Sequence, residues 1–398
     1  MKKAYVIGTC DTKFEDHSFV RDCLNAAGIE TVLVDVGIFP HKHPVDVTRE
    51  EIAAAHPEKP DFLSSVKDRG EAVILMSEAL AAWLKGRADI GGVIGMGGSG
   101  GSSIVSTGMR ALDVGVPKLL VSTVASGDVS PYVGPTDITM MPSITDVAGI
   151  NRISRVVFAN AAHALAGMML HSPPVGEDKK PLLGLTMFGV TTPCVEGLRD
   201  ALRDRFEPII FHATGTGGQS IEKLIDSGLI SHVIDATTTE ICDLFMGGVL
   251  SAGPDRLGAI IRSGIPYVGS VGAMDMVNFG PMDTVPEKYR KRLLHVHNAT
   301  VTLMRTTPAE NREMGLWIAD KLNQCRGPVR FLLPEKGVSI LDAEGMPFYD
   351  PEADEALFSA LEERVEQNAL RRLIRLPHNI NDPEFIAALI SNFEEITE

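Results

Sequence analysis

The sequence predicts an α/β protein made of two doubly wound parallel-sheet subdomains that are related by an internal repeat. Apolar, β-branched runs alternate with helical patterns, which is typical of parallel sheets covered by helices on both faces. The pattern restarts near residue 181. The chain has 398 residues and 44% hydrophobic content, more than one ordinary domain needs. We therefore expect domains at 1–175 and 181–398.

The first domain begins with a strand, a helix and a second strand. Residues 3–8 are an apolar strand-like run, residues 12–28 have helical spacing and end at a glycine, and residues 30–37 are again strand-like. A polar excursion follows. The elements expected after residue 37 are a short helix near 48–55, a helix at 67–87, and strands at 90–96 and 116–124.

The second domain repeats this order after a linker at 171–181, which is rich in proline and charge. Residues 5–37 align with 183–215, and residues 115–135 align with 264–281. The elements expected in this half are strands at 181–189, 207–213 and 328–334, helices at 193–204 and 308–324, and two further helices flanking residues 372–377. The sequence leaves open where the final helix packs.

Composition excludes several classes of partner. The formal net charge of −15 disfavours nucleic acid and anionic membranes. The five cysteines show no CxxC spacing, so they indicate neither a disulfide framework nor a zinc site, and they fit a reducing compartment. No signal peptide and no run of about 18 apolar residues is evident. We expect a cytoplasmic protein without nucleic-acid or membrane partners.

Turns rich in Gly, Ser and Thr follow most predicted strands. The carboxyl ends of parallel strands share one edge of the sheet, and amides at the start of the next helix can bind an anion there. The turn at 95–103 formally matches G-x-G-x-x-G, but it follows the third strand rather than the first, and no P-loop is present. A plain tight turn is the alternative. The candidate ligand-binding residues here are Gly97, Gly98, Ser99, Gly100 and Gly101.

Polar residues near the same edge have two interpretations each. Asp35 ends the second strand, where an acid can accept hydrogen bonds from ribose, or it caps a turn. Lys13 could neutralise phosphate, or it is a solvated lysine. Asp11 and Asp128 could hold Mg²⁺ beside phosphates, although isolated carboxylates more often cap helices.

Several long motifs resemble a known family. "YVIGTCDTKFEDHSFVRDCL", "GVIGMGGSGGSSI", "ATGTGGQSIEKLIDSGLISHVIDATTTE", "GGVLSAGPDRL" and "HVHNATVTLMRTTPAEN" are similar, in order and over nearly the whole chain, to the ATP-binding domain of the plant tobamovirus-resistance protein and to its bacterial relatives. The resemblance implies two Rossmann-like subdomains, ATP bound by the first, and a homodimer. In the plant protein a TIM-barrel domain follows, so a separately encoded TIM-barrel partner is an expectation here.

The resemblance implies a nucleotide-binding role only for the turns whose residues match those motifs. Besides Gly97–Gly101, these positions are Gly8, Thr9, Asp11, Thr12 and Lys13, and then Thr123, Ser126 and Asp128 in the turn after the fourth strand.

The second half offers candidate chemistry. Cys194 starts a helix, which lowers a thiol pKa, and His212 ends the next strand, so a Cys–His pair for acyl transfer is one hypothesis. Packing is the alternative for Cys194. Glu240 either meets substrate or completes a capping box. Asp275 mirrors Asp128 in the repeat and would face the cleft between the halves, so with His212 and Glu240 it is a candidate catalytic residue that meets the substrate.

His295 and His297 alternate on a strand and would face one side, but no third metal ligand is spaced nearby.

These residues together predict an enzyme that uses ATP to act on a small polar metabolite in a cleft between the halves. A nucleotide-sensing interaction protein without turnover is one alternative. A Cys194-dependent acyl-transfer or hydrolytic enzyme is the other.

Overall fold

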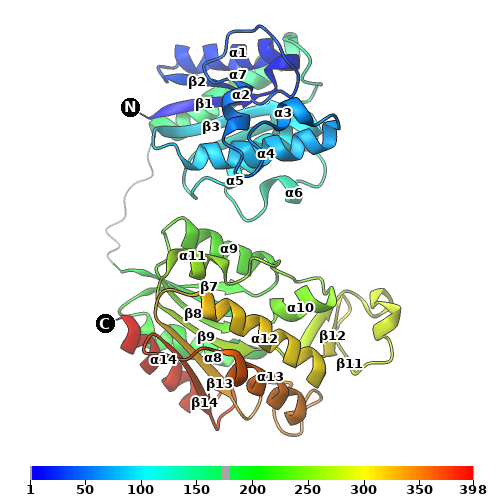
Figure 1. Ribbon diagram of the computed structural model, residues 1–398, viewed down its shortest axis with the longest axis vertical. Coiled ribbons are helices and arrows are strands. Elements are labelled where there is room, and N and C mark those ends of the chain that lie inside the picture. The colour runs from blue at the N-terminus through cyan, green and yellow to red at the C-terminus, as the bar shows by residue number, and fades with distance from the viewer. Residues whose placement is uncertain (1, 172–179, 398) are drawn as a thin grey trace. The chain divides into compact units, whose positions relative to one another are not determined.

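The computed structural model describes residues 2–171 and 180–397. The chain divides into two compact units, Met1–Glu177 and Asp178–Glu398, and each is an α/β domain (Figure 1). The predicted linker at 171–181 lies almost entirely outside the described residues.

The N-terminal unit is built on a parallel sheet of five strands in the order β2-β1-β3-β4-β5. The strands are β1 (Lys3–Gly8), β2 (Thr31–Asp35), β3 (Ile90–Gly97), β4 (Lys118–Ser122) and β5 (Thr139–Pro142). The helices are α1 (Cys10–Ala26), α2 (Arg49–Ala54), α3 (Phe62–Ser65), α4 (Arg69–Lys85), α5 (Ser99–Arg110), α6 (Ser130–Val133) and α7 (Arg152–Leu170). The short helix expected near 48–55 is α2.

Helices cover both faces of this sheet, so the doubly wound prediction is confirmed. On one face, α1 and α7 pack with Val6 and Leu33. On the other, α4 and α5 pack with Ile7 and Val34. Trp83 of α4 contacts Tyr5, with ring centroids 5.9 Å apart.

Helix α7 is long and apolar enough to cross a membrane by length and composition alone. This is weak evidence for a membrane span, because the core helix of a soluble protein passes the same test. Phe158, Ala161 and Leu165 of α7 are buried against the sheet. Packing within the unit therefore accounts for the apolar face that these three residues form.

The C-terminal unit is built on a parallel sheet of six strands in the order β14-β13-β9-β8-β6-β7. The strands are β6 (Leu182–Met187), β7 (Glu207–His212), β8 (His232–Thr237), β9 (Tyr267–Gly272), β13 (Val329–Pro334) and β14 (Arg371–Leu376). A separate antiparallel sheet has the order β10-β12-β11 and comprises β10 (Met276–Phe279), β11 (Leu294–Asn298) and β12 (Val301–Arg305).

The helices of this unit also cover two faces. One layer contains α9 (Thr216–Asp226), α10 (Glu240–Met246), α11 (Gly258–Ser263), α12 (Pro308–Gln324) and α13 (Pro351–Arg364). The other contains α8 (Thr192–Leu202) and the final helix α14 (Pro383–Thr397), which pack against each other. In the first layer, Trp317 of α12 meets Phe245 edge-on, with centroids 6.0 Å apart.

Both parallel sheets begin with the same spatial order. Numbered along the chain, their first five strands run 2-1-3-4-5 in each unit. This shared order agrees with the internal repeat. In such a sheet the winding direction reverses between the first and third strands, and ligands bind beyond the carboxyl ends of the strands at that switch point. The switch points are β1/β3 and β6/β8.

Candidate functional site

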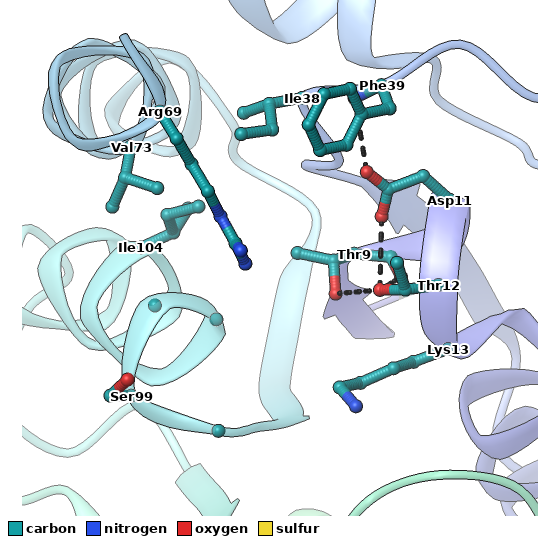
Figure 2. A pocket seen from close by; sticks show the side chains of 13 residues that line it. Thr9, Asp11, Thr12, Lys13, Ile38, Phe39, Arg69, Val73, Ser99 and Ile104 are labelled. Atoms are coloured by element: carbon teal, nitrogen blue, oxygen red, sulfur yellow. Dashed lines mark hydrogen bonds between the residues drawn. The ribbon is translucent and has the colours of Figure 1, made fainter.

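A pocket of about 290 Å³ opens at the β1/β3 switch point of the N-terminal unit (Figure 2). The turns after both strands and the start of α4 contribute to it. Its lining residues are Thr9, Asp11, Thr12, Lys13, Ile38, Phe39, Arg69, Val73, Gly98, Ser99, Gly100, Gly101 and Ile104. Eight of these thirteen were candidate ligand-binding residues in the sequence.

The turn after β1 presents hydroxyl groups. Thr9 precedes α1 without capping it through its side chain, and its Oγ1 lies 3.3 Å from Oγ1 of Thr12. The Thr12 hydroxyl donates to Asp11 Oδ1 at 3.2 Å, and Asp11 Oδ2 accepts from the Phe39 amide at 3.1 Å. Asp11 therefore fixes the turn after β1 against the segment after β2.

The turn after β3 leads directly into α5 with a minimum of side-chain atoms. Gly98 is the N-cap residue and provides no side-chain hydrogen bond to the helix. A Cβ on Gly97 would lie 3.1 Å from the Gly101 Cα, so glycine allows the first helical turn to pack closely on the strand. The first amides of α5 consequently remain available to a ligand.

Two basic residues lie at this pocket. Arg69 is the first residue of α4, and its side chain extends toward Thr9 and Thr12 (Figure 2). Among the described residues, no hydrogen bond or ion pair engages its guanidinium group. Lys13 lines the pocket at a kink in α1, and its Nζ donates to the Val147 carbonyl oxygen.

The remaining wall is apolar. Ile38 and Phe39 come from the segment after β2, Val73 from α4 and Ile104 from α5. Phe39 is 54% exposed, which leaves much of its ring accessible to a planar group. The pocket therefore combines a wall rich in amides, hydroxyls and basic groups with an apolar wall.

Sequence reasoning missed Arg69 and the four apolar residues. Arg69 had one usable signal: it directly follows Asp68, whose carboxylate caps α4 by accepting from the Glu71 amide at 2.8 Å. A cation in the first turn of a helix opposes the helix dipole. An arginine at that place is a reason to look for an anionic ligand.

Two expected ligand residues serve the interior of the N-terminal unit instead. A Cβ on Gly8 would lie 1.1 Å from Nε2 of His17, so Gly8 makes room for a buried histidine. Burial, with the nearby Lys13 charge, lowers the pKa of His17 to about 3. Asp35 is buried and accepts from the Cys10 and Gly37 amides at 3.0 and 2.8 Å.

The second oxygen of Asp35 pairs with His41 Nε2 at 2.8 Å. The capping interpretation therefore accounts for Asp35, and its carboxylate is not part of the pocket lining.

The turn after β4 lies next to the pocket but contributes none of its lining residues. Thr123 Oγ1 lies 3.7 Å from the position of a Gly98 Cβ, next to the glycine turn. Ser126 and Asp128 are exposed and do not line the pocket. Asp128 accepts from the Ser130 amide and hydroxyl at 3.0 and 2.7 Å. Among the described residues, no group of three or more His, Cys, Asp or Glu could hold a metal ion.

Cys194 requires a correction. It lies in the first turn of α8 as expected, but it is fully buried, and burial raises the pKa of its thiol to about 12. The helix was expected to lower that pKa. The amide of Cys194 is bound by Asn381 Oδ1 at 3.2 Å. Cys194 therefore packs in the core beneath α14, and a Cys194–His212 pair receives no support.

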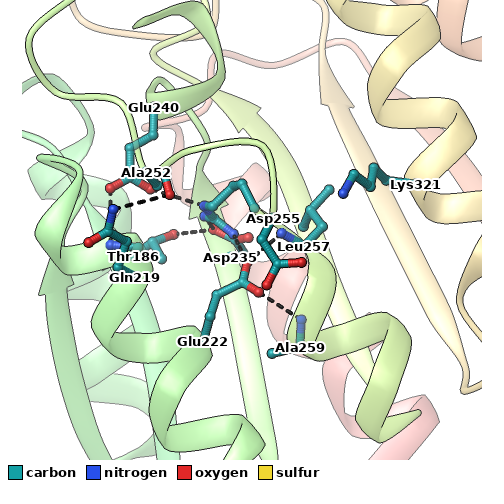
Figure 3. Close-up of polar contacts among 12 residues, drawn as sticks. Thr186, Gln219, Glu222, Asp235, Glu240, Ala252, Asp255, Leu257, Ala259 and Lys321 are labelled. Carbon is teal, nitrogen blue, oxygen red and sulfur yellow. Dashed lines mark hydrogen bonds and ion pairs between the residues drawn. The ribbon is translucent and has the colours of Figure 1, made fainter. Parts of the chain in front are cut away.

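Glu240 is likewise an interior group. Its Oε1 accepts from the Gly215 and Gly218 amides at 2.7 and 3.0 Å. Figure 3 shows Glu240 among the polar contacts of this region. Its Oε2 pairs with Arg256 Nε at 3.0 Å. The glycine turn at 215–218 is therefore already occupied by a carboxylate of the same chain. This role replaces the expected contact between Glu240 and substrate.

A buried ionic cluster surrounds Glu240; we define it as Arg256, Glu222, Asp235 and Glu240. Arg256 contacts Asp235 at 2.7 Å and Glu222 at 3.3 Å. Tyr267 donates to Asp235 at 2.9 Å. Glu222 also accepts from amides at the start of α11, including that of Ala259 at 2.7 Å. These bonds join α9, β8, α10 and α11.

Asp275 is also buried, so the expected substrate contact is corrected to a structural one. The Ser339 hydroxyl donates to its Oδ2 at 2.8 Å. Desolvation raises its pKa to about 6, against the opposing effect of Arg305. Its counterpart in the repeat, Asp128, is exposed, so the two positions differ in environment.

A bulge interrupts the alternation of the two histidines of β11, and the two side chains have different neighbours. The pairing of β11 with β12 shifts between Val296 and Asn298, which makes His297 the extra residue of a bulge. His295 lies edge-on to Phe348, with centroids 6.1 Å apart. His297 instead lines a second pocket, together with His212.

Two family models together match almost the whole chain. The model described as the N-terminal domain of the Uncharacterised protein family (UPF0261) matches residues 2–174. The model of the C-terminal domain of that family matches residues 180–397.

Individual relatives agree with these matches. A UPF0261 protein of Mesorhizobium japonicum is 57% identical over 389 residues, which are 98% of each chain. One from Rhizobium meliloti is 54% identical over 396 residues, 100% of this chain and 99% of the relative. The ToMV resistance protein Tm-1 of Solanum lycopersicum is 42% identical over 99% of this chain, which spans 56% of the tomato protein. The predicted resemblance is confirmed.

Proposed function

The chain belongs to the UPF0261 family, and from that premise we propose that its N-terminal unit binds ATP at the carboxyl ends of β1 and β3. One observation carries the proposal. The uncapped, glycine-lined start of α5 opens on a pocket into which Arg69, unpaired among the described residues, extends (Figure 2). Helix amides and a guanidinium group are suitable partners for phosphate oxygens.

The division of the pocket fits the two ends of a nucleotide. The phosphates lie at Gly98–Gly101, with Arg69 and Lys13 supplying positive charge. The base lies against Ile38 and the exposed ring of Phe39. A volume of about 290 Å³ is near the lower limit of about 300 Å³ for small-molecule sites, so the base extends to the rim.

Mg²⁺ enters with the nucleotide in this proposal. Proteins usually hold Mg²⁺ through one or two carboxylates together with substrate phosphates. Asp11 is the single carboxylate among the lining residues. Its oxygens already accept from Thr12 and Phe39, so the phosphates supply most of the ligands.

A nucleotide-dependent switch without turnover is the second candidate. The lining residues include no histidine, cysteine or glutamate, and Asp11 is engaged. A general base must lie within hydrogen-bond reach of the proton that it removes. The pocket is therefore better equipped to bind ATP than to activate a second substrate. Release of ADP or AMP in the presence of a metabolite mixture would favour the enzyme instead.

Calorimetric titration of the full chain with Mg–ATP tests the proposal. We expect saturable binding, weakened at least tenfold, about 1.4 kcal/mol, by Gly98→Val and by Arg69→Met. Gly98 has a φ of −80°, which valine also adopts, and a Cβ there would only touch Thr123 at 3.7 Å. The first variant therefore obstructs the pocket without straining the backbone.

Two matched variants control for general effects. Gly86→Val places the same side chain at a φ of −81°, at the other end of α4. Lys67→Met removes an exposed charge two residues before Arg69. Both should bind Mg–ATP as the unaltered protein does. Unchanged affinity in folded Gly98→Val and Arg69→Met, or no binding at all, would refute the site.

A further inference from the structure

The C-terminal unit has its own pocket beside the β6 and β7 strand ends. Its volume is about 270 Å³, and its lining residues are Phe188, Gly189, Val190, His212, Thr214, Leu250, His297, Asn298, Val301 and Leu303. They come from the turns after β6 and β7, the segment after α10 and the β11–β12 hairpin. Four separate segments thus enclose one space at the sheet edge where α/β proteins bind ligands.

The walls of this pocket are mainly apolar. Phe188, Val190, Leu250, Val301 and Leu303 provide aliphatic and aromatic surface, and none of the ten lining residues carries a fixed charge. A cavity of about 150 Å³ lined by such residues can hold benzene. The pocket is therefore large enough for a benzene-sized group and a short chain.

Three polar side chains at the pocket, His212, His297 and Asn298, can each donate a hydrogen bond. Among the described residues, no hydrogen bond engages the imidazole nitrogens of His212 or His297. Asn298 accepts from the Thr300 amide and hydroxyl through Oδ1, at 2.8 and 2.9 Å, which leaves its Nδ2 to donate. Because of the bulge in β11, the neighbouring residues His297 and Asn298 both line this pocket.

We propose that this pocket binds a small hydrophobic carboxylate. Its apolar body packs against Phe188, Leu250 and Val301, and its carboxylate accepts hydrogen bonds from His212, His297 and Asn298. A phosphate group is a poorer match, because no Lys or Arg lines the pocket. The inference does not depend on ATP binding in the N-terminal unit.

Titration of the full chain with 3-phenylpropionate and with 3-phenylpropanol tests the proposal. We expect saturable binding of the acid, with at least tenfold preference over the alcohol. His212→Leu and His297→Leu each remove a hydrogen-bond donor. Each should weaken binding of the acid at least fivefold and change the affinity for the alcohol less than twofold. A loss of the preference for the acid over the alcohol would show that the histidines recognise the carboxylate. A change in the shape of the pocket would weaken binding of both compounds.

Further variants keep the test decisive. Val301→Phe fills the hollow from β12 and should weaken both compounds more than tenfold. His295→Leu, two residues before His297 and outside the pocket, should change neither. Gly98→Val should also change neither, whatever its effect on Mg–ATP. Absence of binding to the unaltered protein, equal binding of acid and alcohol, or binding of Zn²⁺ through both histidines in place of the acid would overturn the proposal.

Discussion

The two units share the order of their first five strands, but the turns that follow these strands differ. At the β1/β3 switch point, the first turn of α5 is glycine and serine, and its amides face a pocket. At the β6/β8 switch point, the Thr191 and Thr237 hydroxyls lie 2.7 Å apart and join the two turns. The same order of the first five strands therefore goes with a pocket at the switch point in one unit and with a side-chain hydrogen bond across the switch point in the other.

The glycine turns of the two units are also not equivalent. Gly97–Gly101 follows the third strand of its sheet, whereas 215–218 follows the second. The second turn is occupied by the carboxylate of Glu240. A glycine-rich turn thus predicts free amides, and whether a ligand or the protein itself binds them depends on distant residues.

The largest expected effect concerns the buried ionic cluster. Arg256→Met leaves Glu222, Asp235 and Glu240 buried without their cation. Breaking a buried ion pair in this way costs about 3–5 kcal/mol. Urea unfolding followed by circular dichroism should show the loss, and hydrogen exchange of β8 should assign it to the C-terminal unit.

Arg262→Met is the matched control, because Arg262 lies close by in α11. It contacts Asp226 and Asp255, each at 2.8 Å, at a half-exposed surface site. Such surface pairs contribute about 0–1 kcal/mol. Equal destabilisation by the two variants would mean that the buried cluster stabilises the C-terminal unit no more than a surface ion pair does.

An intermediate effect is expected when the Glu240 carboxylate is removed from the glycine turn at 215–218. Glu240→Ala should destabilise the C-terminal unit by about 2–3 kcal/mol, because the Gly215 and Gly218 amides lose their acceptor. Formate can occupy the vacated place and should restore about 1 kcal/mol of that stability. Thermal unfolding with sodium formate, against sodium chloride at equal ionic strength, measures this rescue. A response no larger than that of the unaltered protein would contradict the comparison.

The smallest effect is expected for Asp128→Asn. Asp128 is exposed and bonded to Ser130, and it does not line the pocket of the N-terminal unit. Its substitution should change Mg–ATP affinity less than twofold in calorimetry. A tenfold loss would restore Asp128 as a metal ligand and would show that the N-terminal site extends to the turn after β4.

Much of the fold could be predicted from local patterns. The strands at 3–8 and 90–96 and the helix at 308–324 lie almost where the sequence placed them, because their apolar periodicity and caps are local. The strand order depends on which strands pair, and no local pattern encodes it. Even so, the turns after the first and third strands meet, as the shared edge of a parallel sheet predicts.

The candidate site was predictable in part for the same reason. Eight lining residues come from those two turns, but Arg69 reaches the pocket from a helix that follows a long excursion. The prediction for Cys194 was wrong for the opposite reason. Its place at a helix start was local, whereas its burial depends on α14 and Asn381, nearly two hundred residues later.

The chain contains two tryptophans, and the fold places one in each unit. Trp83 packs against Tyr5, and Trp317 packs against Phe245. Each half therefore carries a single tryptophan in a structured environment. Replacing either indole with phenylalanine leaves tryptophan emission from the other half alone, so selective excitation of tryptophan follows the melting of the two halves separately without an attached dye.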